Sequence, residues 1–204
     1  NTYDQFYNEH IYVLSAISLT NILNKNELRI FKIKNINVHG GSLRYYICKK
    51  HNQKFKTQSN YLNQIHNEKK FNLHKLSSCY VFKKNVLKIK YELQSTFKKI
   101  KKLNKKIVGY GASAKAVTVL NFCGLKSDYI DYFLDTTKNK IGKYLPGTKI
   151  LVKKYNIKMM SEKHYYFLGA WNFKSEIFKK EKAFLKKGGK FILHLPKPKI
   201  YYLK

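Results

Sequence analysis

The stretch VGYGASAKAV (residues 108–117) decides the fold, because a strand-like apolar run passes through glycines directly into a helix-like run. Gly109 and Gly111 are predicted to lie in the turn, where bare backbone N–H groups and the positive end of a helix can receive a phosphate. Ala114 stands where a dinucleotide-binding fingerprint has its third glycine. The sequence therefore predicts a phosphate-binding turn. Its candidate ligand-contacting residues are Gly109, Gly111, Ala112, Ser113 and Lys115.

Strand-like and helix-like segments alternate through the remainder of the chain. The near-continuous apolar segments are KIVGY, YIDYFLD, TKILV, YYFLGA and KFILHL, and the segments between them include AKAVTVLNF and FKSEIFKKEKAFLKK. Such alternation is typical of a parallel sheet with helices on both faces. Gly188 and Gly189 are expected to end the last helix, and LPKPK to end the last strand. We predict the α/β class, with a Rossmann-like parallel sheet and flanking helices over residues 105–204.

Asp135 follows Gly111 by about 24 residues, close to the position of the acidic residue that binds ribose in dinucleotide-binding folds. A tight strand-to-helix turn in any doubly wound domain, with Asp135 capping the next segment, explains the same residues. Both interpretations of Asp135 stay open on the sequence.

Two further segments precede the predicted sheet. Residues 1–52 contain LSAISLTNILNKNEL, which has helical apolar spacing, and two strand-like runs, LRIFKIKNI and GSLRYYICKK, joined by NVHGG. One helix and a hairpin cannot bury their own apolar faces, so this part is interpreted as the end of a larger sheet. Residues 53–104 are predicted to form one short and one long helix, a linker that packs on the C-terminal domain and whose lysines face water.

The formal net charge of +31 points first to a polyanionic partner. All of the 42 basic residues except Arg29 and Arg44 are lysines, whereas recognition of nucleic-acid grooves relies on the planar fork of arginine. Joint enrichment in lysine, asparagine, isoleucine and tyrosine indicates A/T-rich coding drift at solvated positions. Nucleic acid is therefore not the expected partner.

Cysteine usage and hydropathy bear on the compartment. The three cysteines are far apart and include no Cys-x-x-Cys pair, so neither a disulfide framework nor a zinc site is predicted. No run approaches the roughly 18 apolar residues of a membrane span. We expect a cytoplasmic protein with no metal and no membrane partner.

The segment YDQFYNEH places three reactive side chains, Tyr7, Glu9 and His10, close together near the start of the printed sequence. A histidine side chain has an unperturbed pKa of about 6.5, so it can accept a proton near neutral pH. In a helical turn Tyr7 would share a face with His10 and could donate to a developing oxyanion. Taken alone, His10 is better explained as an ordinary surface histidine.

Six motifs in the same order resemble those of the nucleotide-sugar C-methyltransferases: YNEHIYVLS, VHGGSLR, VGYGASAKAVTVLN, DYIDYFLD, YLPGTKI and WNFKSEI. Members of this family use S-adenosylmethionine to methylate a carbon beside the keto group of a dTDP-linked sugar. They combine a zinc-binding N-terminal module, a domain that binds S-adenosylmethionine, and a C-terminal Rossmann-like domain that helps to hold the nucleotide sugar. The resemblance implies that residues 1–52 are the closing helix and hairpin of a methyltransferase sheet.

The sequence differs from the family pattern in its N-terminal part. The zinc-ligand cysteines and the acidic, glycine-containing strand turn that holds S-adenosylmethionine are absent. The resemblance therefore implies that S-adenosylmethionine does not bind this chain alone, and that a truncated or split gene product is completed by a separately encoded methyltransferase domain. It also implies that the glycine turn at Gly109 faces the sugar nucleotide.

The resemblance assigns roles to the reactive side chains. His10 would be the base that removes the proton beside the ketone, Tyr7 would stabilise the enolate or position the sugar, and Glu9 would bind a hydroxyl. Residues of the hairpin turn could line the sugar pocket or only form the turn. Later residues could shape a nucleotide loop, stack on the base, cap a helix or pack in the core. These further candidates are His39, Gly40, Gly41, Ser42 and Arg44, then Pro146 and Gly147, then Trp171 and Asn172, of which Asn172 is predicted to be an N-cap.

Three functions follow from these observations. The leading one is the base-bearing and nucleotide-sugar-binding part of a C-methyltransferase. The second is a module that binds a nucleotide-diphosphate sugar without turnover, and the third is a lysine-rich protein that binds RNA or DNA.

Overall fold

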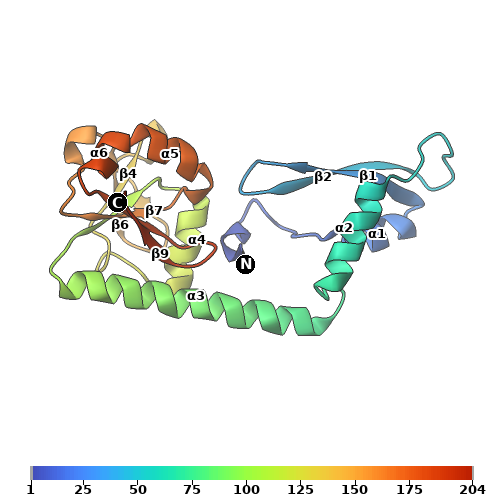
Figure 1. Ribbon diagram of the computed structural model, residues 1–204, viewed down its shortest axis with the longest axis horizontal. Helices are drawn as coiled ribbons and strands as arrows, with labels where there is room; N and C mark the ends of the chain where they lie inside the picture. Colours follow the sequence, from blue (N-terminus) through green and yellow to red (C-terminus); the bar gives the residue numbers. More distant parts are fainter. Residues whose placement is uncertain (1, 204) are drawn as a thin grey trace. The chain divides into compact units, whose positions relative to one another are not determined.

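A computed structural model describes residues 2–203, and the chain divides into two compact units (Figure 1). The hairpin unit comprises Tyr12–Lys84. The sheet unit comprises the described residues up to Ile11 together with those from Asn85 onward. The first residues of the chain therefore group with the C-terminal sheet, whereas the predicted ranges 1–52, 53–104 and 105–204 place them with the hairpin.

The hairpin unit contains the predicted helix and two strands, followed by a second helix. Its elements are α1 (Ala16–Lys25), β1 (Leu28–Ile36), β2 (Ser42–Lys49) and α2 (Ser59–Lys70). The two strands pair antiparallel, with an irregular register between Ile30 and Lys32. A small core of Ala16, Leu23, Ile30 and Ile33 joins the helix to the sheet. The helix-plus-hairpin prediction is confirmed.

Glu68 of α2 ties the two helices of the hairpin unit together. Its Oε1 and Oε2 accept hydrogen bonds from the backbone N–H groups of Ala16 (2.8 Å) and Ile17 (2.9 Å). Ser15 completes the cap, because its side chain accepts from Ser18 N–H. A buried carboxylate at the positive end of α1 satisfies donors that the helix itself leaves unpaired.

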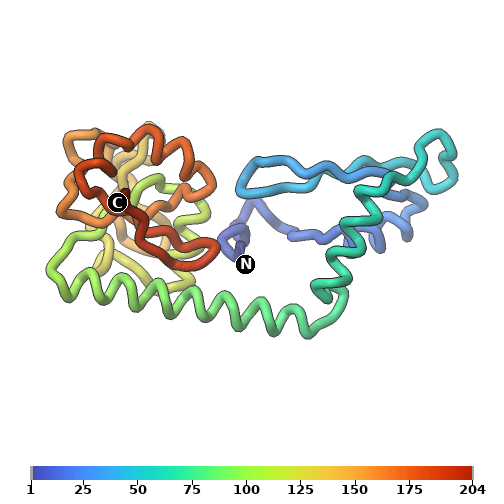
Figure 2. The backbone as a smooth tube through the Cα atoms, viewed as in Figure 1, coloured from blue at the N-terminus to red at the C-terminus, as the bar shows by residue number. Residues whose placement is uncertain are grey.

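The sheet unit is built on seven strands in the order β5-β6-β4-β3-β7-β8-β9. The parallel strands are β3 (Ile107–Tyr110), β4 (Phe133–Asp135), β6 (Ile150–Lys154), β7 (Tyr165–Leu168) and β8 (Lys190–Leu193). The edges are antiparallel: β5 (Tyr144–Leu145) and β9 (Lys199–Tyr201). After β8 the chain turns back on itself to form β9 (Figure 2). The Rossmann-like prediction is confirmed, and the two edge strands were not predicted.

Helices cover both faces of this sheet, as the continuous apolar strands require. They are α4 (Ala114–Cys123), α5 (Lys174–Lys180), α6 (Lys182–Lys186) and the part of α3 (Leu76–Lys102) from Asn85 onward. The sheet unit also contains the short 3-10 helices η1 (Tyr3–Gln5), η2 (Lys138–Lys140), η3 (Ile157–Met159) and η4 (Trp171–Phe173). The predicted short and long helices of residues 53–104 are α2 and α3.

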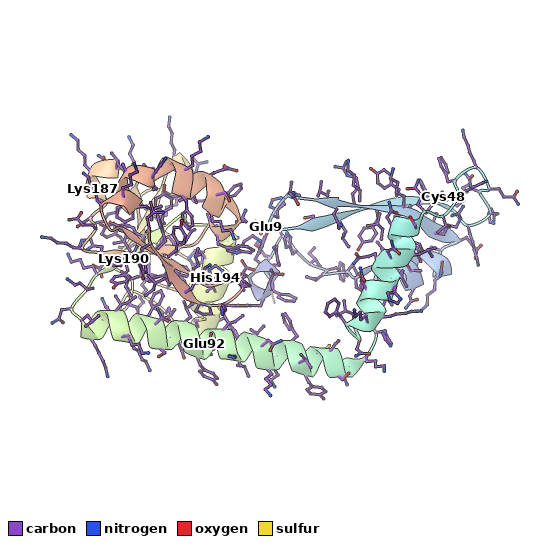
Figure 3. The ribbon with its side chains drawn as sticks, in the orientation of Figure 1. Glu9, Cys48, Glu92, Lys187, Lys190 and His194 are labelled. Carbon is purple, nitrogen blue, oxygen red and sulfur yellow. The ribbon has the colours of Figure 1, made fainter. Side chains whose placement is uncertain are left out.

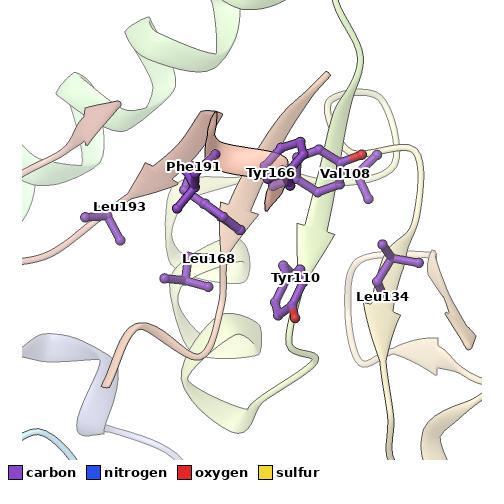
Figure 4. Packing of buried hydrophobic residues seen from close by; sticks show 9 residues of the cluster. Val108, Tyr110, Leu134, Tyr166, Leu168, Phe191 and Leu193 are labelled. Atoms are coloured by element: carbon purple, nitrogen blue, oxygen red, sulfur yellow. The ribbon is translucent and has the colours of Figure 1, made fainter. Parts of the chain in front are cut away.

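Alternate strand residues face the two helical layers. On one face Val108, Tyr110, Tyr166 and Phe191 form a buried cluster, which Phe184 of α6 joins (Figure 4). On the other face Phe167 meets Phe97 of α3, with ring centroids 5.8 Å apart, and Phe133, at 6.3 Å. Both faces of the strands are therefore buried.

The strand order reverses at β3. From β3 the chain proceeds to β4 and β6 on one side, and then returns to β7 and β8 on the other. Loops that leave the carboxyl ends of β3 and β7 diverge at such a point, and ligands of open α/β sheets bind in the crevice between them. The glycine turn quoted above leaves β3 at this position.

Candidate functional site

A cavity of about 410 Å³ lies at the carboxyl ends of β3, β4 and β7. It is large enough for part of a nucleotide, since small-molecule sites in proteins measure roughly 300–1,000 Å³. Helix α5 supplies one wall. The polar and glycine-turn residues of the lining include Gly111, Ser113, Asp135, Lys140, Tyr155 and Lys180.

Gly111 and Gly109 have different structural roles, since Gly111 is in the turn and Gly109 is in the strand before it. Gly111 has φ of +80°, and a Cβ there would lie 2.8 Å from Ala170 Cβ. Gly109 lies inside β3, one residue before its end, so its placement in the turn is corrected. A Cβ on Gly109 would lie 2.2 Å from the ring of Phe133, and its glycine allows two buried strands to approach closely.

The turn uses its own polar groups to hold its shape. Asp135 Oδ2 accepts from Ala112 N–H at 2.7 Å, and Lys140 Nζ donates to Ala112 O at 2.8 Å. Ser113 caps α4 by accepting from Ala116 N–H, and its hydroxyl donates to Gly169 O at 2.8 Å. The N–H of Ala112 is therefore already paired with a carboxylate.

Asp135 is placed as a structural carboxylate. Its second oxygen, Oδ1, accepts from Thr137 N–H at 2.8 Å, and the side chain is only 10% exposed. Burial acts to raise its pKa, but hydrogen bonds from Thr137 and Ala112 and the charge of Lys140 lower the pKa below its usual value. These hydrogen bonds favour the interpretation in which Asp135 orders the turn, and not the one in which it binds ribose directly.

Asp135→Asn is expected to destabilise the protein by about 1 to 3 kcal/mol at neutral pH, the range for charge-assisted hydrogen bonds. Because the folded pKa is depressed, the carboxylate stabilises the fold above its unfolded pKa of about 3.8 and loses this effect as the pH falls below it. Urea titrations at pH 7 and pH 3 should therefore show a smaller difference between variant and parent at pH 3. The exposed Asp128→Asn variant is the control, and an equal deficit at both pH values would contradict the assignment.

Lys115 does not line the cavity among the residues that the structure describes. Its side chain is buried, with Nζ 5.4 Å from the centre of the Tyr7 ring. Burial lowers its pKa, and the nearby charge of Asp4 acts against that shift. Its predicted contact with a phosphate stays a prediction, and the structure places it beneath the segment that carries Tyr7.

Tyr7 and His10 lie together in a hydrogen-bonded turn, in which His10 N–H donates to Tyr7 O at 2.8 Å. Their ring centroids are 4.1 Å apart. The turn is not part of a helix, so the helical geometry expected for this pair is corrected, although the predicted proximity holds. Glu9 is exposed (Figure 3). Burial, followed by the charges of Glu9 and Asp4, raises the pKa of Tyr7, which keeps its hydroxyl protonated as a donor.

The imidazole of His10 is held by one nitrogen. His10 Nδ1 lies 2.8 Å from the backbone carbonyl oxygen of Gln5. A carbonyl oxygen can only accept, so in the neutral ring Nδ1 carries the proton and Nε2 holds the free electron pair. This arrangement leaves Nε2 as the basic atom.

The remaining predicted residues are distributed over both units. His39, Gly40 and Gly41 have positive φ, as the hairpin-turn interpretation requires, and with Ser42 and Arg44 they belong to the hairpin unit. The sheet unit contains the remaining four.

Among those four, Pro146 and Gly147 form a loop held to α4, because Asn121 Nδ2 donates to Pro146 O at 3.0 Å. Trp171 packs against the core cluster, and its Nε1 donates to Asp4. Asn172 lies inside η4, and the N-cap of α5 is Phe173, so the N-cap prediction for Asn172 is wrong.

In the sheet unit, sequence reasoning missed three buried charged or titratable side chains: Asp4, Glu181 and His194. Glu181 Oε1 accepts from the hydroxyls of Tyr110 (2.7 Å) and Tyr155 (2.6 Å), next to the cavity. No spacing marks these residues, since each is buried by segments distant in the sequence. The one available signal is Asp4 itself, an acid three residues before Tyr7.

Residues 2–203 contain no cluster of three or more histidine, cysteine or acidic side chains arranged to hold a metal ion. Within the same residues, no helix combines the length and the apolar character that crossing a bilayer would need.

The sequence also matches known proteins. The profile of the C-methyltransferase C-terminal domain matches residues 37–196. The chain belongs to this C-methyltransferase family. It is 28% identical over 200 residues to the C-methyltransferase NovU of Streptomyces niveus, a match that covers 98% of this chain and 47% of NovU. The chain thus spans about half the length of that relative.

Proposed function

We propose that this chain is the base-bearing and nucleotide-sugar-binding part of an enzyme that methylates a carbon beside the keto group of a nucleotide-linked sugar. The observation that carries the proposal is the hydrogen bond from His10 Nδ1–H to the Gln5 carbonyl. It leaves Nε2 free to accept a proton, on a segment that packs against the first turn of α4, because Lys115 of α4 lies under the Tyr7 ring.

The chemistry begins with removal of a proton from the carbon next to the ketone. His10 Nε2 accepts this proton, and the bond from Nδ1–H to the Gln5 carbonyl stabilises the imidazolium that forms. The electron pair left on carbon delocalises onto the ketone oxygen as an enolate. The Tyr7 ring lies beside His10, and its protonated hydroxyl would donate a hydrogen bond to that oxygen.

The cavity beside the glycine turn is the proposed site of the nucleotide diphosphate. Its lining combines aromatic rings, Tyr110 and Tyr155, with the ammonium groups of Lys140 and Lys180. Aromatic rings can pack against a base, and cations can pair with phosphates. Ala170 of this lining is adjacent in sequence to Trp171, which contacts the His10 segment through Asp4. The proposed general base, His10, and the proposed nucleotide pocket therefore lie at the same edge of the sheet.

S-adenosylmethionine supplies the methyl group in this family, and the described residues do not fit it. The acidic residue that follows the glycine turn, Asp135, is nearly buried and has both oxygens paired with backbone N–H groups, so it offers no free carboxylate to a ribose hydroxyl. We assign the donor site to a methyltransferase domain outside the printed residues, either fused upstream or separately encoded. The free thiols of Cys48, Cys79 and Cys123 support the expected cytoplasmic location.

Calorimetric titration of the chain with dTDP- and UDP-linked sugars tests the proposed pocket. We expect saturable binding, and we expect Lys180→Ala to weaken it by about 1 to 3 kcal/mol, the range for a lost charge-assisted hydrogen bond. Lys179→Ala is the matched control, since Lys179 is an exposed neighbour that does not line the cavity. Saturable binding of S-adenosylmethionine without binding of a nucleotide sugar would overturn the assignment.

A further inference from the structure

Asp4 is a completely buried carboxylate in η1, and its partners come from the opposite end of the chain. Its Oδ2 accepts a short hydrogen bond from Trp171 Nε1 and lies 3.5 Å from Nε2 of the fully buried His194. Trp171 begins η4 just after β7, and His194 follows the last residue of β8 (Figure 3). The carboxylate is thus held at the carboxyl ends of two parallel strands.

This carboxylate remains ionised despite its burial. Burial acts to raise its pKa, but His194 and Trp171, both at Oδ2, and the charge of Lys115 lower the pKa below the usual value. An ionised carboxylate without such partners would be costly to bury. The contacts of Asp4 with the sheet are therefore specific to its charge and to its position.

The residues around Asp4 fix the same segment to α4. The Tyr3 ring lies 5.3 Å from the ring of Phe122, and the Thr118 hydroxyl donates to Phe6 O at 3.1 Å. Gln5 is the residue directly after Asp4 in η1, and its carbonyl oxygen is the acceptor for His10 Nδ1. A continuous set of contacts therefore leads from the strands through Asp4 and Gln5 to the imidazole of His10.

We propose that Asp4 and Trp171 are positioning residues that set the tautomer and orientation of His10. Acting through η1, they hold the Gln5 carbonyl where it accepts from Nδ1–H, so that Nε2 is the free basic nitrogen. The importance of this tautomer for catalysis rests on the proposed function, in which His10 is the base. The structural link between Asp4 and the imidazole does not depend on it.

The inference has a spectroscopic test on the chain as it stands. Two-bond ¹H–¹⁵N correlation spectra of the imidazole distinguish the Nδ1–H from the Nε2–H tautomer. We expect a single Nδ1–H form for neutral His10 in the parent protein. Asp4→Asn, which removes the charge, and Trp171→Phe, which removes the donor, should each produce a mixture of both tautomers. Amide hydrogen exchange in residues 5–10 should become at least about tenfold faster, because the segment opens locally.

Asp128→Asn is the matched control, an exposed aspartate in the same unit whose replacement should change neither readout. If Asp4→Asn unfolds the sheet unit, Trp171→Phe decides the question, because it keeps a large aromatic ring in the core. Retention of the single Nδ1–H tautomer in the folded variants would overturn the inference, as would an Nε2–H form in the parent. Loss of the whole fold in both variants would also overturn it, since the pair would then support the domain and not the imidazole.

These outcomes are separable from those of the proposed function. A parent protein with the expected tautomer and no catalysed exchange of the sugar proton would leave the positioning role intact and remove the base role. Catalysed exchange that persists in the two variants, with the tautomer unchanged, would keep the base role of His10 and remove the positioning role of Asp4 and Trp171.

Discussion

His10→Asn is expected to abolish exchange of the sugar proton beside the ketone with deuterated water, in the protein joined to a donor-binding methyltransferase domain. General-base catalysis contributes about 10²- to 10⁴-fold to such steps, so exchange should fall by at least that range. Asparagine keeps a polar group near the Gln5 carbonyl but has no basic nitrogen to take the proton. Deuterium incorporation into a nucleotide-linked keto sugar, followed by NMR, measures the effect directly.

The His10→Asn variant should still bind the sugar nucleotide although it no longer exchanges the sugar proton. The proposed nucleotide pocket is lined by residues of β3, β4 and α5, so affinity for the sugar nucleotide should stay near the parental value. Tyr7→Phe should slow exchange while leaving the base in place, since it removes only a donor to the enolate. His66→Asn, an exposed histidine on α2, is the matched control. Parental exchange in His10→Asn would show that another group takes the proton.

Glu181→Ala is expected to lower the free energy of unfolding of the sheet unit by about 2 to 5 kcal/mol, because it leaves buried tyrosine hydroxyls without their acceptor. Burial, together with the interaction with Glu181, raises the pKa of both Tyr110 and Tyr155, so these hydroxyls stay protonated and donate to the carboxylate. Alanine removes both bonds and opens a space behind the cavity. Trp171 is the single tryptophan, so its fluorescence reports urea unfolding of this unit.

Two further variants test whether the loss of stability comes from the unpaired tyrosine hydroxyls. Tyr155→Phe should cost less than Glu181→Ala, because one hydroxyl is removed together with its bond and no donor is left unpaired. Glu162→Ala, at an exposed glutamate of the same unit, should be nearly neutral. A Glu181→Ala protein as stable as Glu162→Ala would mean that the two tyrosines find other acceptors.

The sequence predicted the sheet because its strands carry the pattern that burial on both faces demands. The segments KIVGY and YYFLGA became β3 and β7, at the centre of the sheet, with helices on both sides. The edge strands β5 and β9 are only two and three residues long, too short to produce a pattern. Gly109 was misplaced because a glycine inside a buried strand and a glycine in a turn look alike until the facing ring of Phe133 is known.

The site was predictable where its residues are neighbours in sequence. Tyr7 and His10 are three residues apart, so any tight turn brings them together, whether helical or not. The partners of Asp4 and Glu181 arise from packing between distant segments, which no local spacing encodes. Asp135 had the expected position, and its role depended on where the Ala112 and Thr137 N–H groups point.

The contact between Asp4 and Trp171 joins residues 167 positions apart, and this separation matters while the protein is being made. At roughly 5–20 residues per second, Trp171 leaves the ribosome on the order of 10 to 30 s after Asp4. Strand β8 and His194 follow later still. Phe122 and Cys123, which contact Tyr3 in the folded unit, are absent for most of that interval. Until they are synthesised, the aromatic ring of Tyr3 is exposed and can contact other proteins. The segment that carries His10 is therefore synthesised before the sheet and reaches its place only after nearly the whole sheet has emerged.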